Sequence, residues 1–271
     1  MLVRKKANSN EYMEVFADIE VEFTADSGNS TIVPLGKDWH TVGIQLSGGL
    51  DSALLLYLTT KAIQDNNLDL KIQPISVFIP SKVKNIASTE AIIDKIRELT
   101  GANFINDGLI FDMPIEETTT HDGKKDKYFV NMIRELFHNG TINFEYNGNT
   151  KNPPEEARVG WKNDEHRQKN RDDASSIYST PHCASPHYGM DKADIINLYL
   201  KYDIFDDIAP LTCSCDENID LVHELELNVP CGSCWWCEER KYGFEKNNVE
   251  DPAPVLSYNE YLKVPSMRPT E

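Results

Sequence analysis

Six consecutive residues near position 50 combine glycine, hydroxyl and carboxylate groups in a pattern suited to binding phosphate. The sequence from Ser47 to Ser52 reads SGGLDS. Gly48 and Gly49 lack a Cβ atom, so the backbone can turn sharply there and approach a ligand closely. The two serines add hydroxyl donors. Because Asp51 would repel a phosphate unless a cation lay between them, the pattern also predicts a bound Mg²⁺ ion with oxygen ligands.

The residues on either side of this motif predict a strand before it and a helix after it. Val42 to Leu46 are apolar at alternate positions, and residues 50–58 are rich in leucine. A helix that begins near Asp51 would direct free amide N–H groups and the positive end of its dipole at the turn, which favours an anion. The alternative is an ordinary strand-to-helix turn with an Asp or Ser cap. The lysine-containing nucleotide motif GxxxxGK[ST] is absent.

Further strands and helices are expected to alternate along the chain. Strands are predicted within residues 11–24 (at a sheet edge), 71–79, 103–106 and 141–146, and helices within 88–101, 127–138 and 190–202. This order predicts an α/β fold, a Rossmann-like parallel sheet with helices on both faces and a nucleotide at the carboxyl ends of the strands. Residues 27–38, with two glycines and a proline, are expected to form a loop. Residues 78–82, beginning at Phe78, either contact the adenine or ribose or simply form the end of the strand.

Two segments in the middle of the chain are polar or carry functional groups. Residues 147–173 contain adjacent prolines and many charges, which predicts a loop or lid. Its cationic side chains either contact substrate or phosphates or form a solvated face: Arg158, His166, Arg167 and Arg171. Residues 180–188 bring together His182, Cys183 and His187, but they lack a C-x-x-C pair. We expect a rigid active-site loop or plain connection there rather than a second metal site.

The six cysteines are crowded toward the end of the chain. Cys231, Cys234 and Cys237 have C-x-x-C-x-x-C spacing, which can direct three sulfur atoms at one point. Cys213 or Cys215 could supply a fourth thiolate. Zn²⁺ in a structural role suits four thiolates. An iron–sulfur cluster and a redox dithiol are the alternatives.

The composition limits the class of protein. The 271 residues are enough for one large domain with a small appendage, and the formal net charge of −17 argues against a nucleic-acid duplex or an anionic membrane as partner. No apolar run reaches the ~18 residues of a transmembrane helix. Clustered cysteines favour a metal over a disulfide framework, so we expect a cytoplasmic protein. The expected organisation is N-terminal strands and a loop (1–38), a nucleotide-binding core (39–210) and a cysteine-rich segment (211–271).

Several of these motifs together resemble a known enzyme family. SGGLDS resembles the pyrophosphate loop (PP-loop) of the N-type ATP pyrophosphatases. Residues 192–215, KADIINLYLKYDIFDDIAPLTCSC, and residues 231–246, CGSCWWCEERKYGFEK, are similar to the C-terminal part of the 7-cyano-7-deazaguanine synthases (QueC). On this match Cys215 takes the fourth metal-ligand position and Cys213 stands where the family has tryptophan. Lys192, Arg240 and Phe244 match a lysine, an arginine and an aromatic residue of the family.

The resemblance implies an ATP-dependent ligase. A carboxylate would be adenylated with release of pyrophosphate, ammonia would replace AMP, and a second adenylation would give the nitrile 7-cyano-7-deazaguanine from 7-carboxy-7-deazaguanine. Asp51, Ser47 and Lys192 would be the catalytic residues, with Mg²⁺ and Zn²⁺ as cofactors and a possible homodimer as the assembly. ATP would be bound by Leu46, Ser47, Gly48, Gly49, Leu50, Asp51, Ser52 and Phe78. Zinc would be bound by Cys215, Cys231, Cys234 and Cys237.

The resemblance does not extend over the whole chain. The family stretch near G-V-N…D-Y-S-G-Y-P-D-C-R, which helps hold the deazapurine, has no counterpart in residues 107–187, and 15 residues separate Cys215 from Cys231. An adenylating amide ligase with a different small-molecule or protein acceptor is therefore an alternative function. A non-catalytic ATP-binding regulatory protein is a second alternative. A tRNA-modifying enzyme is disfavoured by the acidity of the chain.

Overall fold

A computed structural model describes residues 1–6, 10–78, 83–112, 124–161, 171, 176–215, 232 and 234–252. The strands are β1 Leu2–Lys5, β2 Tyr12–Val15, β3 Ile19–Thr24, β4 Ser30–Leu35, β5 Thr41–Gln45, β6 Lys71–Phe78, β7 Leu109–Asp112, β8 Phe144–Tyr146, β9 Tyr178–Thr180 and β10 Cys183–Ala184. The helices are α1 Leu50–Asp65, α2 Val83–Thr100, α3 Lys124–His138, α4 Lys192–Lys201, α5 Phe205–Ile208 and α7 Trp235–Lys246, with 3-10 turns η3 Glu155–Arg158 and η6 Ala209–Leu211.

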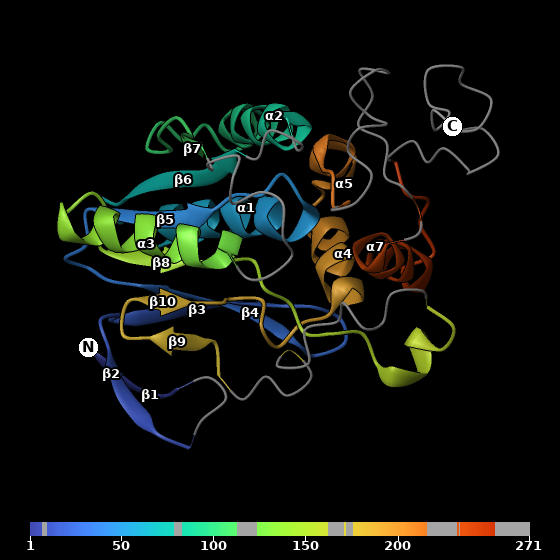
Figure 1. The fold of residues 1–271 in the computed structure, drawn as a ribbon, viewed down its shortest axis with the longest axis horizontal. Helices are drawn as coiled ribbons and strands as arrows, with labels where there is room; N and C mark the ends of the chain where they lie inside the picture. Colours follow the sequence, from blue (N-terminus) through green and yellow to red (C-terminus); the bar gives the residue numbers. More distant parts are fainter. Residues whose placement is uncertain are drawn as a thin grey trace.

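The largest sheet has six strands in the order β7-β6-β5-β8-β10-β9 (Figure 1). All neighbouring pairs in it are parallel except β10 with β9. From β5 the chain proceeds outward to β6 and β7, then crosses to the other side of β5 to form β8 and β10. The direction of winding therefore reverses between β5 and β8, where open parallel sheets have their ligand crevice. This topology confirms the predicted Rossmann-like fold.

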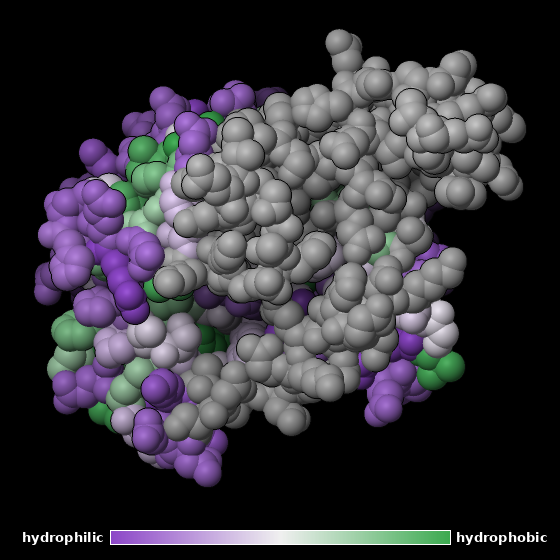
Figure 2. Space-filling view, viewed as in Figure 1, coloured by the Kyte–Doolittle hydropathy of each residue, from purple (hydrophilic) through white to green (hydrophobic). Residues whose placement is uncertain are grey.

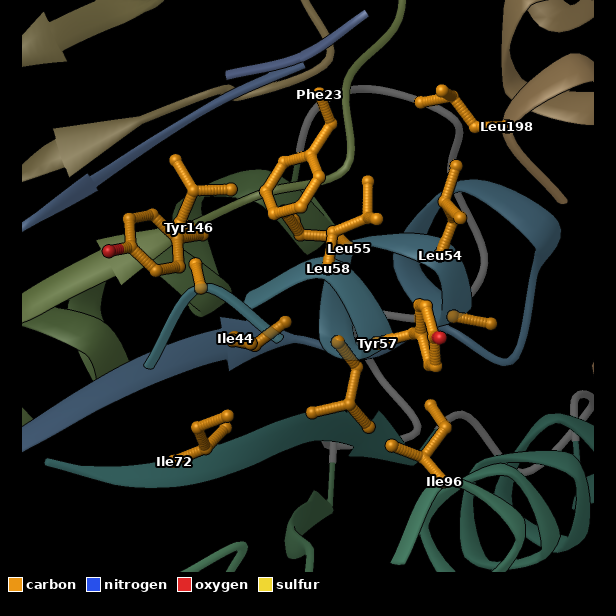
Figure 3. Close-up of a cluster of buried hydrophobic side chains, with 14 of the residues drawn as sticks. Phe23, Ile44, Leu54, Leu55, Tyr57, Leu58, Ile72, Ile96, Tyr146 and Leu198 are labelled. Carbon is orange, nitrogen blue, oxygen red and sulfur yellow. The ribbon is translucent and has the colours of Figure 1, made fainter. Parts of the chain in front are cut away.

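Helices cover both faces of this sheet. Side chains alternate across a strand, so Ile72 and Ile75 of β6 point to opposite faces. Ile72 belongs to the main core with α1 and α2, whereas Ile75 packs with Ile133 and Leu136 of α3. Figure 3 shows the main core, in which apolar side chains of α1 lie between β5 and Phe23 of the β3–β4 hairpin. α1 is buried on almost every side because the hairpin, α2 and α4 cover the faces that the sheet does not.

Two sequence expectations about the N-terminal part were wrong. Residues 27–38 are not all loop, because β4 lies within them and pairs with β3 along its whole length. Pro34 is tolerated because this hairpin is a separate two-stranded sheet, and an edge strand needs only half of its N–H groups for pairing. The strands within residues 11–24 are not members of the main sheet either: β2 pairs with β1, and β3 with β4, although β2 lies beside the edge strand β9.

The third parallel strand also lies later than expected. Residues 103–106 make only a single bridge, from Ile105 to Ile72, and the strand that pairs with β6 is β7. β7 was not predicted because polar residues precede it. In addition, two of its four residues, Ile110 and Asp112, are exposed and alternate with partly buried neighbours.

The surface of the described residues is mostly hydrophilic. Figure 2 shows small, scattered apolar groups on one face. Exposed apolar side chains of the N-terminal residues include Val3, Tyr12 and Phe16. Among the helices in the described ranges, none has both the length and the apolar character needed to cross a bilayer.

Candidate functional site

The SGGLDS motif forms a tight turn between β5 and α1, at the reversal point of the sheet. Gly48 has φ +80°, in the left-handed region that favours glycine. Gly49 is the N-cap residue of α1, and no side chain caps the helix. Within the described ranges, no hydrogen bond occupies the amide N–H groups of Leu50, Asp51 or Ser52. The amino end of α1 therefore offers three donors and its positive dipole to an anion.

The two serines of the motif bond to each other and to the turn itself. The Ser52 hydroxyl lies 3.2 Å from the Ser47 amide nitrogen, 3.2 Å from the Ser47 hydroxyl and 3.2 Å from the Gly49 carbonyl oxygen. The Gly49 amide donates to the Ser47 hydroxyl at 3.4 Å. Both hydroxyls thus stabilise the turn, in addition to the donor role that the sequence predicts for them.

The loop after β8 packs directly against the first turn of α1 at Gly148. A Cβ atom on Gly148 would lie only 3.1 Å from the Ser52 amide nitrogen and 3.3 Å from the Ser52 Cα. A side chain at this position would therefore press on the first turn of α1, and glycine allows the two segments to meet.

Asp51 and Lys192 form a close ion pair at the amino end of α1. The Lys192 Nζ atom lies 2.6 Å and 2.5 Å from the two carboxylate oxygens of Asp51. Lys192 is 3% exposed, and the Asp51 side chain is 23% exposed. Lys192 is the first residue of α4, whose N-cap residue Asp191 makes a complete capping box. Two residues that are 141 positions apart are thereby brought together, beside the uncapped helix end.

Close contact between α7 and α4 holds Lys192 in place. A Cβ atom on Gly243 would lie 2.7 Å from the Lys192 carbonyl oxygen and 2.8 Å from its Cγ atom. α4 and α7 lie side by side in Figure 1. Only a glycine at this point lets α7 approach the backbone of Lys192.

Gly243→Ala is therefore expected to destabilise the protein by about 1–3 kcal/mol, because the added methyl group overlaps backbone atoms that cannot move freely. Chemical denaturation measures the effect. Gly189→Ala is the matched control: its nearest contact would be 4.0 Å away, and we expect little change. Equal stability of the two variants would contradict the close α4–α7 packing.

His187 contacts the first turn of α1 through the main-chain oxygen of Asp51. It is fully buried, its Nε2 atom lies 3.1 Å from the Asp51 main-chain oxygen, and its Nδ1 atom lies 2.7 Å from the Thr31 hydroxyl. A carbonyl oxygen can only accept, so Nε2 carries the proton and donates to Asp51, which leaves Nδ1 of the neutral ring to accept from the Thr31 hydroxyl. Burial lowers the pKa of His187 from 6.5 to about 4. The imidazole is therefore neutral at neutral pH.

This histidine is expected to make the protein sensitive to acid. The unfolded chain takes up a proton below pH 6.5 and the folded chain only near pH 4, so the contribution of His187 to stability is complete above pH 6.5 and is lost as the pH falls toward 4. Between pH 7.5 and pH 5 the loss is about 2 kcal/mol. The stability difference between the wild type and His187→Gln should shrink by that amount in urea titrations at the two pH values. If the stability difference between the wild type and His187→Gln were the same at both pH values, it would contradict the lowered pKa of His187.

In the described part of the chain, the other two candidate residues of the 180–188 segment, His182 and Cys183, form no hydrogen bond with the first turn of α1. His182 stacks on Phe16 at 4.5 Å between ring centroids, and Cys183 accepts from the Asn147 amide at 3.8 Å. Burial raises the pKa of the Cys183 thiol and of the neighbouring Glu145 carboxyl. A raised pKa keeps the thiol protonated and unreactive. The segment begins at the last residue of β9 and contains β10, and it does not bring its histidines and cysteine to one point.

Three further residues were expected at the nucleotide site: Leu46, Leu50 and Phe78. Leu46 and Leu50 are fully buried in the core and can offer only backbone groups. The backbone of Phe78 pairs with Asp112 at the end of β6, whereas its side chain and residues 79–82 lie outside the described part of the chain.

Arg171 is almost fully buried and is held by protein groups. It is 8% exposed and donates to Thr150 and, at 3.0 Å, to Glu239 of α7. This buried pair attaches the loop after β8 to α7. The sequence predicted that Arg171 contacts substrate or belongs to a solvated face. It could not indicate a buried partner 68 residues away, because Arg171 lies in a polar, charged segment. His166 and Arg167 lie outside the described residues.

Three thiols gather beside the turn. The sulfur atoms of Cys215, Cys234 and Cys237 all lie within 4.8 Å of one another, and Cys215 and Cys234 are 4.0 Å apart. Cys234 and Cys237 are one helical turn apart at the start of α7, so their side chains share a face. Cys213 packs against the group. Cys231 lies outside the described residues. The three thiols together could hold a metal ion.

Comparisons with known proteins identify no family. No protein-family model matches the chain, and no curated protein matches it. Solved structures similar to it include the U34-tRNA thiolase NcsA from Methanococcus maripaludis with its [4Fe-4S] cluster, at 15% identity and a TM-score of 0.40 over 78% of this chain and 74% of that chain. NAD+ synthetase from Burkholderia pseudomallei matches at 13% identity and a TM-score of 0.33 over 78% of this chain and 82% of that chain.

Proposed function

We propose that this chain is an ATP-dependent ligase that adenylates a carboxylate, releases pyrophosphate and transfers the acyl group to ammonia. The observation that carries the proposal is the uncapped amino end of α1 at the reversal point of the sheet, with Asp51 and Lys192 beside it. Such a helix end binds phosphates through its N–H groups and dipole. The intact SGGLDS motif, with its resemblance to the PP-loop, supports cleavage between the α and β phosphates.

In this proposal the residues of the chain position the phosphates and balance their charge. The amides of Leu50, Asp51 and Ser52 would receive the β and γ phosphates, and Lys192 would neutralise charge that develops on the leaving pyrophosphate. Mg²⁺, when bound by Asp51, would bridge the carboxylate and the phosphate oxygens. The Lys192 ammonium now holds that carboxylate, so nucleotide binding would redistribute its contacts.

The reaction has two stages. A carboxylate oxygen attacks the α phosphorus, the bond to the β phosphate oxygen breaks, and an acyl adenylate and pyrophosphate form. Ammonia then attacks the acyl carbon, AMP leaves and a proton is lost, giving an amide. If the amide oxygen is adenylated by a second ATP, loss of AMP and a proton leaves a nitrile. The proposed acceptor is 7-carboxy-7-deazaguanine, which would become 7-cyano-7-deazaguanine, a queuosine precursor.

Zinc is the proposed ion at the thiol group. A zinc ion bound to four thiolates at about 2.3 Å in tetrahedral geometry requires sulfur atoms about 3.8 Å apart, and the 4.0 Å between Cys215 and Cys234 fits this spacing. The cysteines of an iron–sulfur cluster bind different irons and lie farther apart, so the geometry favours a single ion. Cys215, Cys234 and Cys237, with Cys231 as the proposed fourth ligand, would hold it. Its role would be structural.

The acceptor is tested by incubating the protein with ATP, Mg²⁺ and ammonium, with and without 7-carboxy-7-deazaguanine, and identifying products by mass spectrometry. Acceptor-dependent formation of the nitrile supports the full proposal. Accumulation of the amide alone would favour the alternative amide ligase, which the missing deazapurine stretch already suggests. No product from this or any other carboxylate, despite bound ATP, would favour a non-catalytic ATP-binding protein.

A further inference from the structure

The glycine turn and the thiol group are joined by one short piece of chain. The amide of Cys213 donates a hydrogen bond to the carbonyl oxygen of Gly48 at 2.8 Å. Cys215, two residues later, belongs to the thiol group. We define residues 212–215 as the connecting segment.

The hydrogen bond from Cys213 fixes one peptide plane of the turn. The Gly48 carbonyl oxygen accepts from Cys213, while the amide of the same peptide unit, at Gly49, donates to the Ser47 hydroxyl. A rotation of this peptide would break both bonds. Glycine at φ +80° allows several backbone conformations, so the turn needs such a restraint to keep the helix amides open to an anion.

Both ends of the connecting segment are attached to α7. At one end, Arg240 donates from Nη1 to the Thr212 hydroxyl at 2.9 Å and to its carbonyl oxygen at 3.3 Å. Arg240 is itself fixed by Asp251, at 2.6 and 2.8 Å. At the other end, Cys215 meets two thiols of α7. A metal ion at the thiols would join this end to α7 by coordinate bonds.

We propose that Cys213 is a positioning residue for the glycine turn, and that a metal ion at the thiol group strengthens nucleotide binding by holding the connecting segment in place. The inference rests on the proposed function, because it takes ATP as the ligand of the turn. Coupling between two sites is reciprocal. Zinc and nucleotide therefore increase each other's affinity by the same factor, of about tenfold, within the range usual for such coupling.

The first experiment measures binding of a non-hydrolysable ATP analogue with Mg²⁺ by isothermal titration calorimetry. The full-length protein is compared with zinc bound and after removal of zinc by a chelator. We expect about a tenfold weaker affinity in the zinc-free protein. No binding by either form would overturn the proposed function itself. Equal binding by both forms would overturn the inference and leave the proposed function standing.

Two variants at one position separate the backbone contact from the thiol. Cys213→Ala removes the sulfur and keeps the N–H, whereas Cys213→Pro removes both. Thr212 has φ −94° and ψ 141°, a conformation that a following proline accepts. With zinc bound, Cys213→Ala should bind the analogue like the wild type, and Cys213→Pro about tenfold more weakly. Circular dichroism and zinc content verify that both are folded and loaded.

This comparison needs no zinc-free protein, so it stays decisive if removal of zinc unfolds the chain. Analogue affinity of Cys213→Pro equal to that of Cys213→Ala would overturn the positioning role. In the reciprocal measurement, the analogue should raise zinc affinity in Cys213→Ala and not in Cys213→Pro. The same increase in both variants would also contradict the proposal.

Discussion

Asp51→Asn is expected to lower kcat/KM for the ligase reaction by about 100-fold or more, because it removes the charge that would hold Mg²⁺ against the leaving pyrophosphate. The variant also leaves the buried Lys192 ammonium without its partner. Breaking a buried pair on one side costs about 3 kcal/mol. Steady-state kinetics and urea denaturation measure the two effects separately.

A double variant separates catalysis from stability. Asp51→Asn with Lys192→Met removes both charges, so it should recover most of the stability lost in the single variant while activity stays low. Asp206→Asn, at an exposed carboxylate, is the matched control and should behave like the wild type. Wild-type activity of Asp51→Asn would exclude the glycine turn as the phosphate site.

Cys234→Ser should nearly abolish zinc binding and lower the melting temperature. The fully buried Cys234 is the N-cap residue of α7 and lies 4.0 Å from Cys215 between sulfur atoms, and serine is a poor zinc ligand. A structural zinc ion contributes its binding energy to folding, on the order of 10 kcal/mol in small zinc domains. In this larger chain the main core is independent of the site, so we expect a partial loss of stability.

Elemental analysis and calorimetry test this prediction. The wild type should contain about one zinc ion per chain and lose stability when a chelator is added. Cys234→Ser should contain almost no zinc, and a chelator should not change its stability. Cys183→Ser is the control, because Cys183 lies outside the thiol group beside Asn147. Unchanged zinc content of Cys234→Ser would refute the assignment of this cysteine as a ligand.

The parts of the fold that were predictable from sequence are those with strong local signals. α3 and α4 show clear apolar periodicity, β5 and β6 are short apolar runs, and α1 is dense in leucine. The glycine motif between β5 and α1 indicated where the turn would lie. β4 and β7 were missed for local reasons: Pro34 and its neighbouring glycines are typical of loops, and β7 is only four residues long, with polar flanks.

The tertiary contacts of the candidate site could not be read from local patterns. Lys192 was identified through the family resemblance, but its pairing with Asp51 depends on how α4 meets α1. His187 gave no signal beyond a histidine in a Pro-rich segment, and its burial follows from the position of Thr31 on the unpredicted β4. The hydrogen bond from Cys213 uses a backbone amide, for which no side-chain pattern exists.

The central claim is that ATP is cleaved between its α and β phosphates at the glycine turn. The most direct measurement is ³¹P NMR of the nucleotide products formed by the wild-type protein from ATP, Mg²⁺, ammonium and 7-carboxy-7-deazaguanine, with Asp51→Asn as the inactive control. The account predicts AMP and pyrophosphate in equal amounts. ADP and inorganic phosphate as the products would contradict it.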